Sequence, residues 1–259
     1  MFDWFRDRRR KAIREKPFPA EWENILSDNV PYFARLAEED QNTLRDLIKV
    51  FLEEKRFEGC GGIEIDDEIR VTVAAQACIL ILRHDADIYP DLEVILVYPS
   101  AYLDRRPKTV EGGIVIEDPE ARLGESWSRG VVVLAWDAVV RGASDIRDGK
   151  NVVFHEFAHQ LDTEDGAADG APVLERRAAY GPWARVLGAA YAGLVRDDQE
   201  GNKTVLDTYG ATNPAEFFAV VTESFFERPR ALRAKHPALY DQMREFYGQD
   251  PVTLASGKR

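Results

Sequence analysis

Two of the four histidines in this chain stand four residues apart with a glutamate between them, within NVVFHEFAHQLD at residues 151–162. Apolar residues recur at helical spacing through this stretch and Asn151 can cap its start, so we expect a helix here. His155 and His159 then share one face, because four helical residues correspond to about 6 Å of rise and about 40° of rotation. Both imidazoles can therefore bind one metal ion.

The pattern His-Glu-x-x-His is typical of zinc hydrolases, in which two neutral imidazoles bind Zn²⁺ and a carboxylate reaches the metal-bound water. Glu156 stands in the position of that carboxylate and can act as a general base. The alternative is an ordinary helix whose histidines form hydrogen bonds and whose glutamate is solvated. A third metal ligand elsewhere in the sequence would favour the metal site.

Asp162 is the nearest candidate for that third ligand. It follows His159 by three residues and lies on roughly the same face of the expected helix. A carboxylate in this position can equally orient an imidazole through a hydrogen bond without touching the metal. We therefore rank Asp162 second.

A better candidate lies in DTYGATNPAEFFAVVTESFF at residues 207–226. Asn213 can cap a helix whose first residue is Pro214, and Glu216 and Glu223 are seven residues apart, so they share one side of it. A second helix that presents a glutamate to the histidine helix is the geometry of gluzincins. The alternative for Glu216 is a capping box, in which its carboxylate accepts a hydrogen bond from the residue-213 amide.

The remaining sequence predicts an α+β fold that is mostly helical, with a small mixed sheet beside the histidine helix, as in zincins. Short β-branched runs bounded by Gly, Pro or Asp predict strands, and apolar residues at helical period predict helices. The expected strands are residues 92–99, 112–118 and 130–136. The expected helices are residues 31–57 (one or two helices), 66–82, 151–162, 174–196 and a segment that starts at the TNP of residues 212–214.

We expect a single metallopeptidase-like domain over residues 17–250. Residues 1–16 carry seven Lys and Arg side chains beside Phe2, Trp4 and Phe5. This segment could contact a partner or an anionic membrane surface, but we expect a frayed, solvated arm. Residues 251–259 are expected to form a loose tail.

The composition narrows the classes of function. A formal net charge of −12 and a pI near 4.9 argue against direct nucleic-acid binding, which depends on clustered lysine and arginine. No apolar stretch approaches the length of a membrane span, and the N-terminus lacks the apolar region of a signal peptide. Cys60 and Cys78 give no disulfide framework, so we predict a cytoplasmic protein with reduced thiols.

Five stretches together resemble the Mlc titration factor A family, and the similarity covers nearly the whole chain. They are FEGCGG, ILVYPSAY, LGESWSRGVVVLAWD, NVVFHEFAHQLD and TNPAEFFAVVTESFF. In its metal-site region that family is similar to the catalytic domain of anthrax lethal factor, which also has a tyrosine seven residues before the glutamate of an A-E-F-F-A motif. Here that pair is Tyr209 and Glu216.

The resemblance implies one Zn²⁺ per chain. Its implied ligands are His155, His159 and Glu216. Glu156 is then the general base and acid, Tyr209 stabilises the transition state, and Glu223 is left to support the site. Without the resemblance, Tyr209 could simply pack in the turn before Gly210.

The implied activity is that of a zinc metallopeptidase of aminopeptidase type, acting on peptides or proteins. A second implied function is regulatory, because the family is named for sequestering the transcriptional repressor Mlc, and the two functions are compatible. Such peptidases often bind substrate as an added strand at a sheet edge, for which WSRGVVVLAW at residues 127–136 is our candidate. Its unbroken apolar run is equally typical of a buried central strand.

Overall fold

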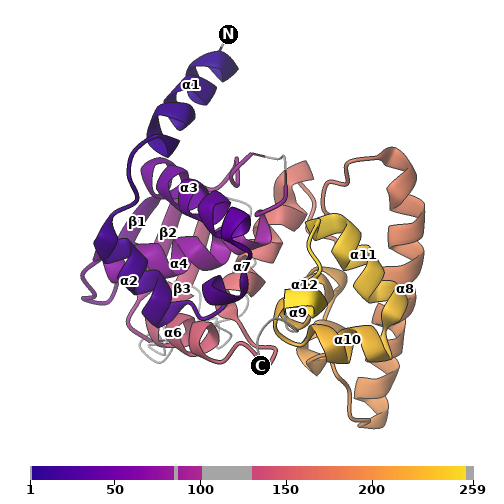
Figure 1. Ribbon diagram of the computed structural model, residues 1–259. Helices are drawn as coiled ribbons and strands as arrows, with labels where there is room; N and C mark the ends of the chain where they lie inside the picture. The colour runs from indigo at the N-terminus through magenta and orange to yellow at the C-terminus, as the bar shows by residue number, and fades with distance from the viewer. Residues whose placement is uncertain (1, 85–86, 101–129, 255–259) are drawn as a thin grey trace, which may run out of the picture.

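The helix that carries the two histidines, α7 (Val152–Asp162), lies near the middle of the molecule (Figure 1). The structure is a computed structural model that describes residues 2–84, 87–100 and 130–254. On one side of α7 are the sheet and helices of the N-terminal half of the chain, and on the other are helices of the C-terminal half. Elements from both halves pack directly on α7.

A parallel sheet with strand order β1-β2-β3 forms the core of the N-terminal half. In register, Val94 pairs with Arg56 on one side and with Val131 on the other. Ile95 and Val132 are fully buried, as expected for a parallel sheet covered by helices. The strands are β1 (Arg56–Gly59), β2 (Val94–Tyr98) and β3 (Val131–Ala135).

The expected α+β class is confirmed, because the described chain is mostly helical with a small sheet beside α7. The strands predicted at 92–99 and 130–136 are confirmed as β2 and β3, whereas 112–118 lies outside the described residues. The sequence pattern does not predict β1, whose only strong strand former is Phe57; main-chain pairing with β2 defines it. The three described strands are all parallel rather than mixed, and β3 forms one edge of them.

Helices of the N-terminal half surround this sheet. The predicted helix at 66–82 is confirmed as α4, which is buried along nearly its whole length and begins at Asp66, whose carboxylate accepts from the Ile69 amide. None of the helices in the described part of the chain combines the length and the apolar content needed to cross a bilayer. The helices of this half are α1 (Phe2–Arg14), α2 (Ala20–Asn29), η1 (Phe33–Arg35), α3 (Glu38–Glu54), α4 (Asp67–Leu80) and α6 (Trp136–Ser144).

The basic N-terminal segment is helical, which corrects the expectation of a frayed arm. In α1, the guanidinium of Arg10 lies 2.7 Å from the Glu54 carboxylate and also pairs with Asp87, while Ile13 is buried. These acidic partners come from α3 and from the chain after α4, far away in sequence. The basic run alone therefore gives no sign that α1 is held in place.

The C-terminal half consists of helices that pack around α9 (Pro214–Glu227), which is buried from Ala215 to its end. The helix predicted at 174–196 is confirmed but begins and ends later, and it stops at Gly201, which adopts a left-handed conformation. Residues 251–254 of the expected loose tail form a short helix, and 255–259 lie outside the described residues. The other elements of this half are η3 (Thr163–Asp165), η4 (Arg177–Ala179), α8 (Tyr180–Glu200), η5 (Thr208–Ala211), α10 (Pro229–Lys235), α11 (Pro237–Tyr247) and α12 (Pro251–Leu254).

Both helices of the site begin at the asparagines that the sequence predicts as caps. Asn213 Oδ1 accepts from the Glu216 amide at 2.9 Å, and Asn151 Oδ1 accepts from the Phe154 amide at 3.0 Å. Asn151 is also buried, and its Nδ2 donates to Gln76 Oε1 at 2.9 Å and to Glu227 Oε1 at 3.1 Å. Asn151 thus joins α7 to both halves, whereas Asn213 serves as a cap alone.

These two caps should differ in their contribution to stability. Asn213→Ala loses one cap and should lower the free energy of unfolding by about 1 kcal/mol. Asn151→Ala also removes the buried donor to Gln76 Oε1 and Glu227 Oε1, and it should lower the free energy of unfolding by about 2–4 kcal/mol. Urea unfolding of the two metal-free variants beside the wild type measures the difference. Equal losses would mean that the side-chain contacts of Asn151 contribute nothing beyond capping.

Candidate metal centre

The packing of α9 against α7 brings together His155, His159 and Glu216. The possible ligand atoms of these three side chains all lie within 4.8 Å of one another. Glu216 Oε2 lies 3.0 Å from His155 Nε2 and 3.5 Å from His159 Nε2. Two imidazole nitrogens and one carboxylate oxygen are a donor set suited to Zn²⁺ with an open fourth position. The side chains that the structure gathers therefore fit the expected metal.

The carboxylate of Glu216 lies beside the two histidines rather than at the start of α9. Its main-chain amide is capped by Asn213, and its carboxylate is turned away from the start of α9 towards the two histidines. Glu216 is therefore placed as a ligand would be, and the cap of α9 does not need its side chain.

Asp162 lies apart from this cluster, although it is on the same helix as the histidines. Its Oδ2 accepts from the Gly170 amide at 2.9 Å, which fastens the loop after α7 to the end of that helix. Gly170 has a positive φ, and a Cβ there would lie only 2.5 Å from the Pro214 carbonyl oxygen, so the loop passes close to the start of α9. Burial raises the pKa of Asp162 to about 7. Asp162 thus holds the loop that follows α7 in place and does not orient an imidazole.

Glu223 occupies the position from which a carboxylate can orient His155. Its Oε1 lies 2.8 Å from His155 Nδ1, and its Oε2 accepts from the Asn151 amide at 2.5 Å. When Nδ1 donates a proton to Glu223, Nε2 faces Glu216 and the space between the candidate ligands, where it can bind a metal once it gives up its own proton. Glu223 therefore fixes both the ring orientation and the tautomer that a metal requires.

The electrostatics of the cluster favour a positive charge at its centre. Burial acts to lower the pKa of His155, but hydrogen bonds with Glu216 and Glu223 outweigh it and raise this pKa to about 10. Burial acts to raise the pKa of Glu216, yet hydrogen bonds with His155 and His159 lower it to about 2. For His159, burial dominates and lowers the pKa. Without a metal, a proton on His155 balances the negative charge of the neighbouring carboxylates. A divalent cation bound at the same place would balance that charge instead.

Glu156 and Tyr209, the expected catalytic residues, flank these ligands. Glu156 is buried on α7, and its charge contributes to the raised pKa of His155. Tyr209 stands on η5, with its ring centroid 5.9 Å from that of His155 and 38% of its surface exposed. Asp207 holds this turn, since its carboxylate accepts from the Tyr209 amide at 3.0 Å and pairs with Lys150 at 3.1 Å. The structure thus places a carboxylate and a phenol beside the candidate ligands.

Glu227 is a further member of the site that the sequence reasoning missed. Its Oε2 accepts from the amides of Gly149 and Lys150 at 3.0 and 3.1 Å, and its Oε1 accepts from Asn151. Burial raises its pKa to about 8. The signal available in the sequence was spacing, because Glu227 follows Glu223 by four residues and so continues the same side of α9.

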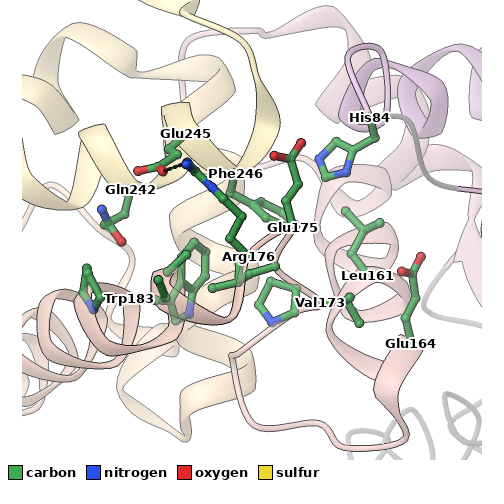
Figure 2. A pocket seen from close by; sticks show the side chains of 15 residues that line it. His84, Leu161, Glu164, Val173, Glu175, Arg176, Trp183, Gln242, Glu245 and Phe246 are labelled. Carbon is green, nitrogen blue, oxygen red and sulfur yellow. Dashed lines mark hydrogen bonds and ion pairs between the residues drawn. The ribbon is translucent and has the colours of Figure 1, made fainter.

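A cavity of about 340 Å³ lies beside the cluster and is lined by His155 and Tyr209, among others. A larger cavity, of about 430 Å³, lies near the C-terminal end of α7, where Leu161 meets Trp183 and Phe246 (Figure 2). The lining of the larger cavity contains none of the three clustered ligands. Cavity volume alone would therefore not have pointed to the candidate metal centre.

A small sheet, a helix that bears His-Glu-x-x-His and a second helix that adds a glutamate define a metallopeptidase-like protein. A sequence model of the family described as glucose-regulated metallo-peptidase M90 matches residues 4–248, so the chain belongs to this family.

The chain is also similar to proteins of other bacteria along most of its length. An uncharacterized protein of Synechocystis sp. is 42% identical over 251 residues, which cover 96% of this chain and 90% of that protein. Mlc titration factor A of Cronobacter sakazakii is 32% identical, with 90% of this chain and 88% of the relative covered. Mlc titration factor A of Klebsiella pneumoniae is also 32% identical, with 89% and 86% covered.

Proposed function

We propose that this protein is a zinc-dependent peptidase of aminopeptidase type, with His155, His159 and Glu216 as the metal ligands. The convergence of their ligand atoms within 4.8 Å carries the proposal. Membership of the M90 metallopeptidase family supports it. The raised pKa of His155 supports it as well, since it reflects a centre that favours positive charge.

The residues around the ligands have roles that follow from their chemistry. Bound zinc supplies a Lewis acid that polarises a peptide carbonyl and acidifies water. Glu156 takes the proton from the attacking water and later returns it to the leaving amine. The phenol of Tyr209 donates a hydrogen bond to the oxyanion that develops on the carbonyl oxygen. Glu223 holds His155 in position through Nδ1.

The substrate in this proposal is a peptide or a protein that lies along β3, one edge of the described sheet. β3 packs on α7, so a strand added there would run beside the helix that carries the ligands. We place the protein in the cytoplasm, which is supported by the free thiols of Cys60 and Cys78.

A second role, the binding and sequestration of an Mlc-type transcriptional repressor, is favoured by the name of the relatives, Mlc titration factor A. The net charge of −12 supports contact with such a protein rather than with its DNA. In this reading peptidase activity is secondary, and both activities can reside in one molecule.

Glu156→Gln separates the two roles. The variant should keep its fold and its zinc, lose peptide hydrolysis by a factor of about 10²–10⁴, and keep any stoichiometric partner binding. Turnover of a peptide library, zinc content and repressor binding should be measured together. Glu21→Gln, the same change on the exposed face of α2, serves as the control. Undiminished hydrolysis by Glu156→Gln would remove the proposed mechanism.

Glu216→Ala and Asp162→Ala together test the ligand set. Glu216→Ala should reduce the zinc affinity by orders of magnitude, because two imidazoles alone are left. Asp162→Ala removes a buried hydrogen bond to Gly170 and should cost stability, but it should leave one zinc per chain. Zinc is measured by elemental analysis after dialysis against a weak chelator. The reverse pattern would make Asp162 the third ligand.

Tyr209→Phe tests the proposed role of the Tyr209 hydroxyl in the reaction. If its hydroxyl stabilises the oxyanion, kcat should fall about 10²–10³-fold with KM and zinc content nearly unchanged. Tyr180→Phe is a matched control, because Tyr180 is about equally exposed and its hydroxyl accepts from the Leu174 amide at 3.1 Å. Wild-type turnover in the Tyr209 variant would exclude Tyr209 from the mechanism, and a changed zinc content would indicate that its oxygen is a ligand.

A further inference from the structure

One face of α1 exposes two adjacent aromatic side chains. Trp4 is 58% exposed and Phe5 is 61% exposed, and their ring centroids lie 5.0 Å apart. Arg8 lies over the Trp4 ring at 5.6 Å, and Lys11 follows one turn later on the same side. These four residues, Trp4, Phe5, Arg8 and Lys11, form the outer face of α1. An aromatic pair beside two cations on a helix is typical of a surface that meets a membrane interface.

On the opposite, inner face of α1, the basic side chains form ion pairs with acidic residues elsewhere in the protein. Arg6 and Arg10 both pair with Asp87, and Arg9 lies 3.0 Å from Glu53. By contrast, Arg8 and Lys11 make no ion pair with any residue that the structure describes. The basic residues of the inner face therefore hold α1 to the body, whereas Arg8 and Lys11 face outward.

The position of α1 keeps the outer face away from the acidic body. In Figure 1 the N-terminal end of α1 extends away from the rest of the molecule. Trp4 and Ile13 are separated by about 14 Å along the helix axis, so the aromatic pair lies well beyond the part of α1 whose side chain is buried in the body. Residues 1–16 carry seven basic and three acidic side chains in a chain of net charge −12. The segment that contains α1 therefore carries a net positive charge on an otherwise acidic protein.

We propose that the outer face of α1 binds the interface of membranes that contain anionic lipids. Lipid headgroups offer negative charge to Arg8 and Lys11, and the boundary with the acyl chains accepts the rings of Trp4 and Phe5. A second copy of the chain suits this face less well. Its acidic surface could pair with the cations, but no other helix among the described residues exposes two adjacent large hydrophobic side chains.

Co-sedimentation of the full-length protein with vesicles tests this proposal. With about 30% phosphatidylglycerol in phosphatidylcholine the protein should bind, and with phosphatidylcholine alone it should not. The double variant Arg8→Glu and Lys11→Glu should lower the partition coefficient by about thirtyfold or more, from the usual contribution of each basic residue near an anionic surface. Trp4→Ala with Phe5→Ala should reduce it at constant charge.

The matched control is Arg185→Glu with Lys203→Glu, which makes the same charge change at exposed positions on α8 and in the chain after it. This control should bind vesicles like the wild type, and all variants should keep the wild-type melting temperature. The proposal is overturned if the wild type fails to sediment with the anionic vesicles, or if the control loses as much binding as the α1 charge variant. It is also overturned if the wild type is a dimer that the aromatic variant converts to monomers, without any lipid binding.

Discussion

Three carboxylates of α9, those of Glu216, Glu223 and Glu227, lie along α7 and its N-terminal end. Glu227 accepts from the Gly149 and Lys150 amides, Glu223 accepts from the Asn151 amide and contacts His155, and Glu216 faces both histidines. The amides that precede a helix are where negative charge is most stabilising, since its first N–H groups lack partners and its dipole is positive there. The packing of α9 against α7 thus orders the start of α7, the ring of His155 and the carboxylate of Glu216.

Such a row of buried carboxylates needs compensation, because burial disfavours their charged forms. It raises the pKa of Glu223 and brings that of Glu227 to about 8. Glu216 differs: although burial also acts to raise its pKa, the two histidines hold it at about 2. Glu216, which faces both imidazoles, is therefore the carboxylate of this row whose pKa lies below its usual range. Loss of a histidine would leave buried carboxylate charge without a partner and would destabilise the site, whereas a bound cation would compensate that charge.

The rest of the fold holds α7 and α9 rigidly against each other. α4, buried almost throughout, supports α7 from the N-terminal half, and its Gln76 reaches Asn151 directly. On the other side, the aromatic residues of α9 pack with those of α11, as in the stacking of Phe225 on Tyr247 at 5.7 Å. Since core side chains are close-packed, a shift of α9 by one residue would require repacking of both halves. The cores of both halves together therefore determine how His155, His159 and Glu216 lie relative to one another.

The sequence by itself determined the elements and the local chemistry of the site. The His-Glu-x-x-His spacing, the caps Asn151 and Asn213 and the mostly helical α+β class follow from periodicity and residue type, which act over a few residues. Tertiary structure decided what depends on distant partners. It turned Glu216 rather than Asp162 towards the histidines, used Glu227 to hold the start of α7, and held the basic α1 against acids of α3. Spacing along a chain fixes which residues share a helix face, but only packing fixes what that face meets.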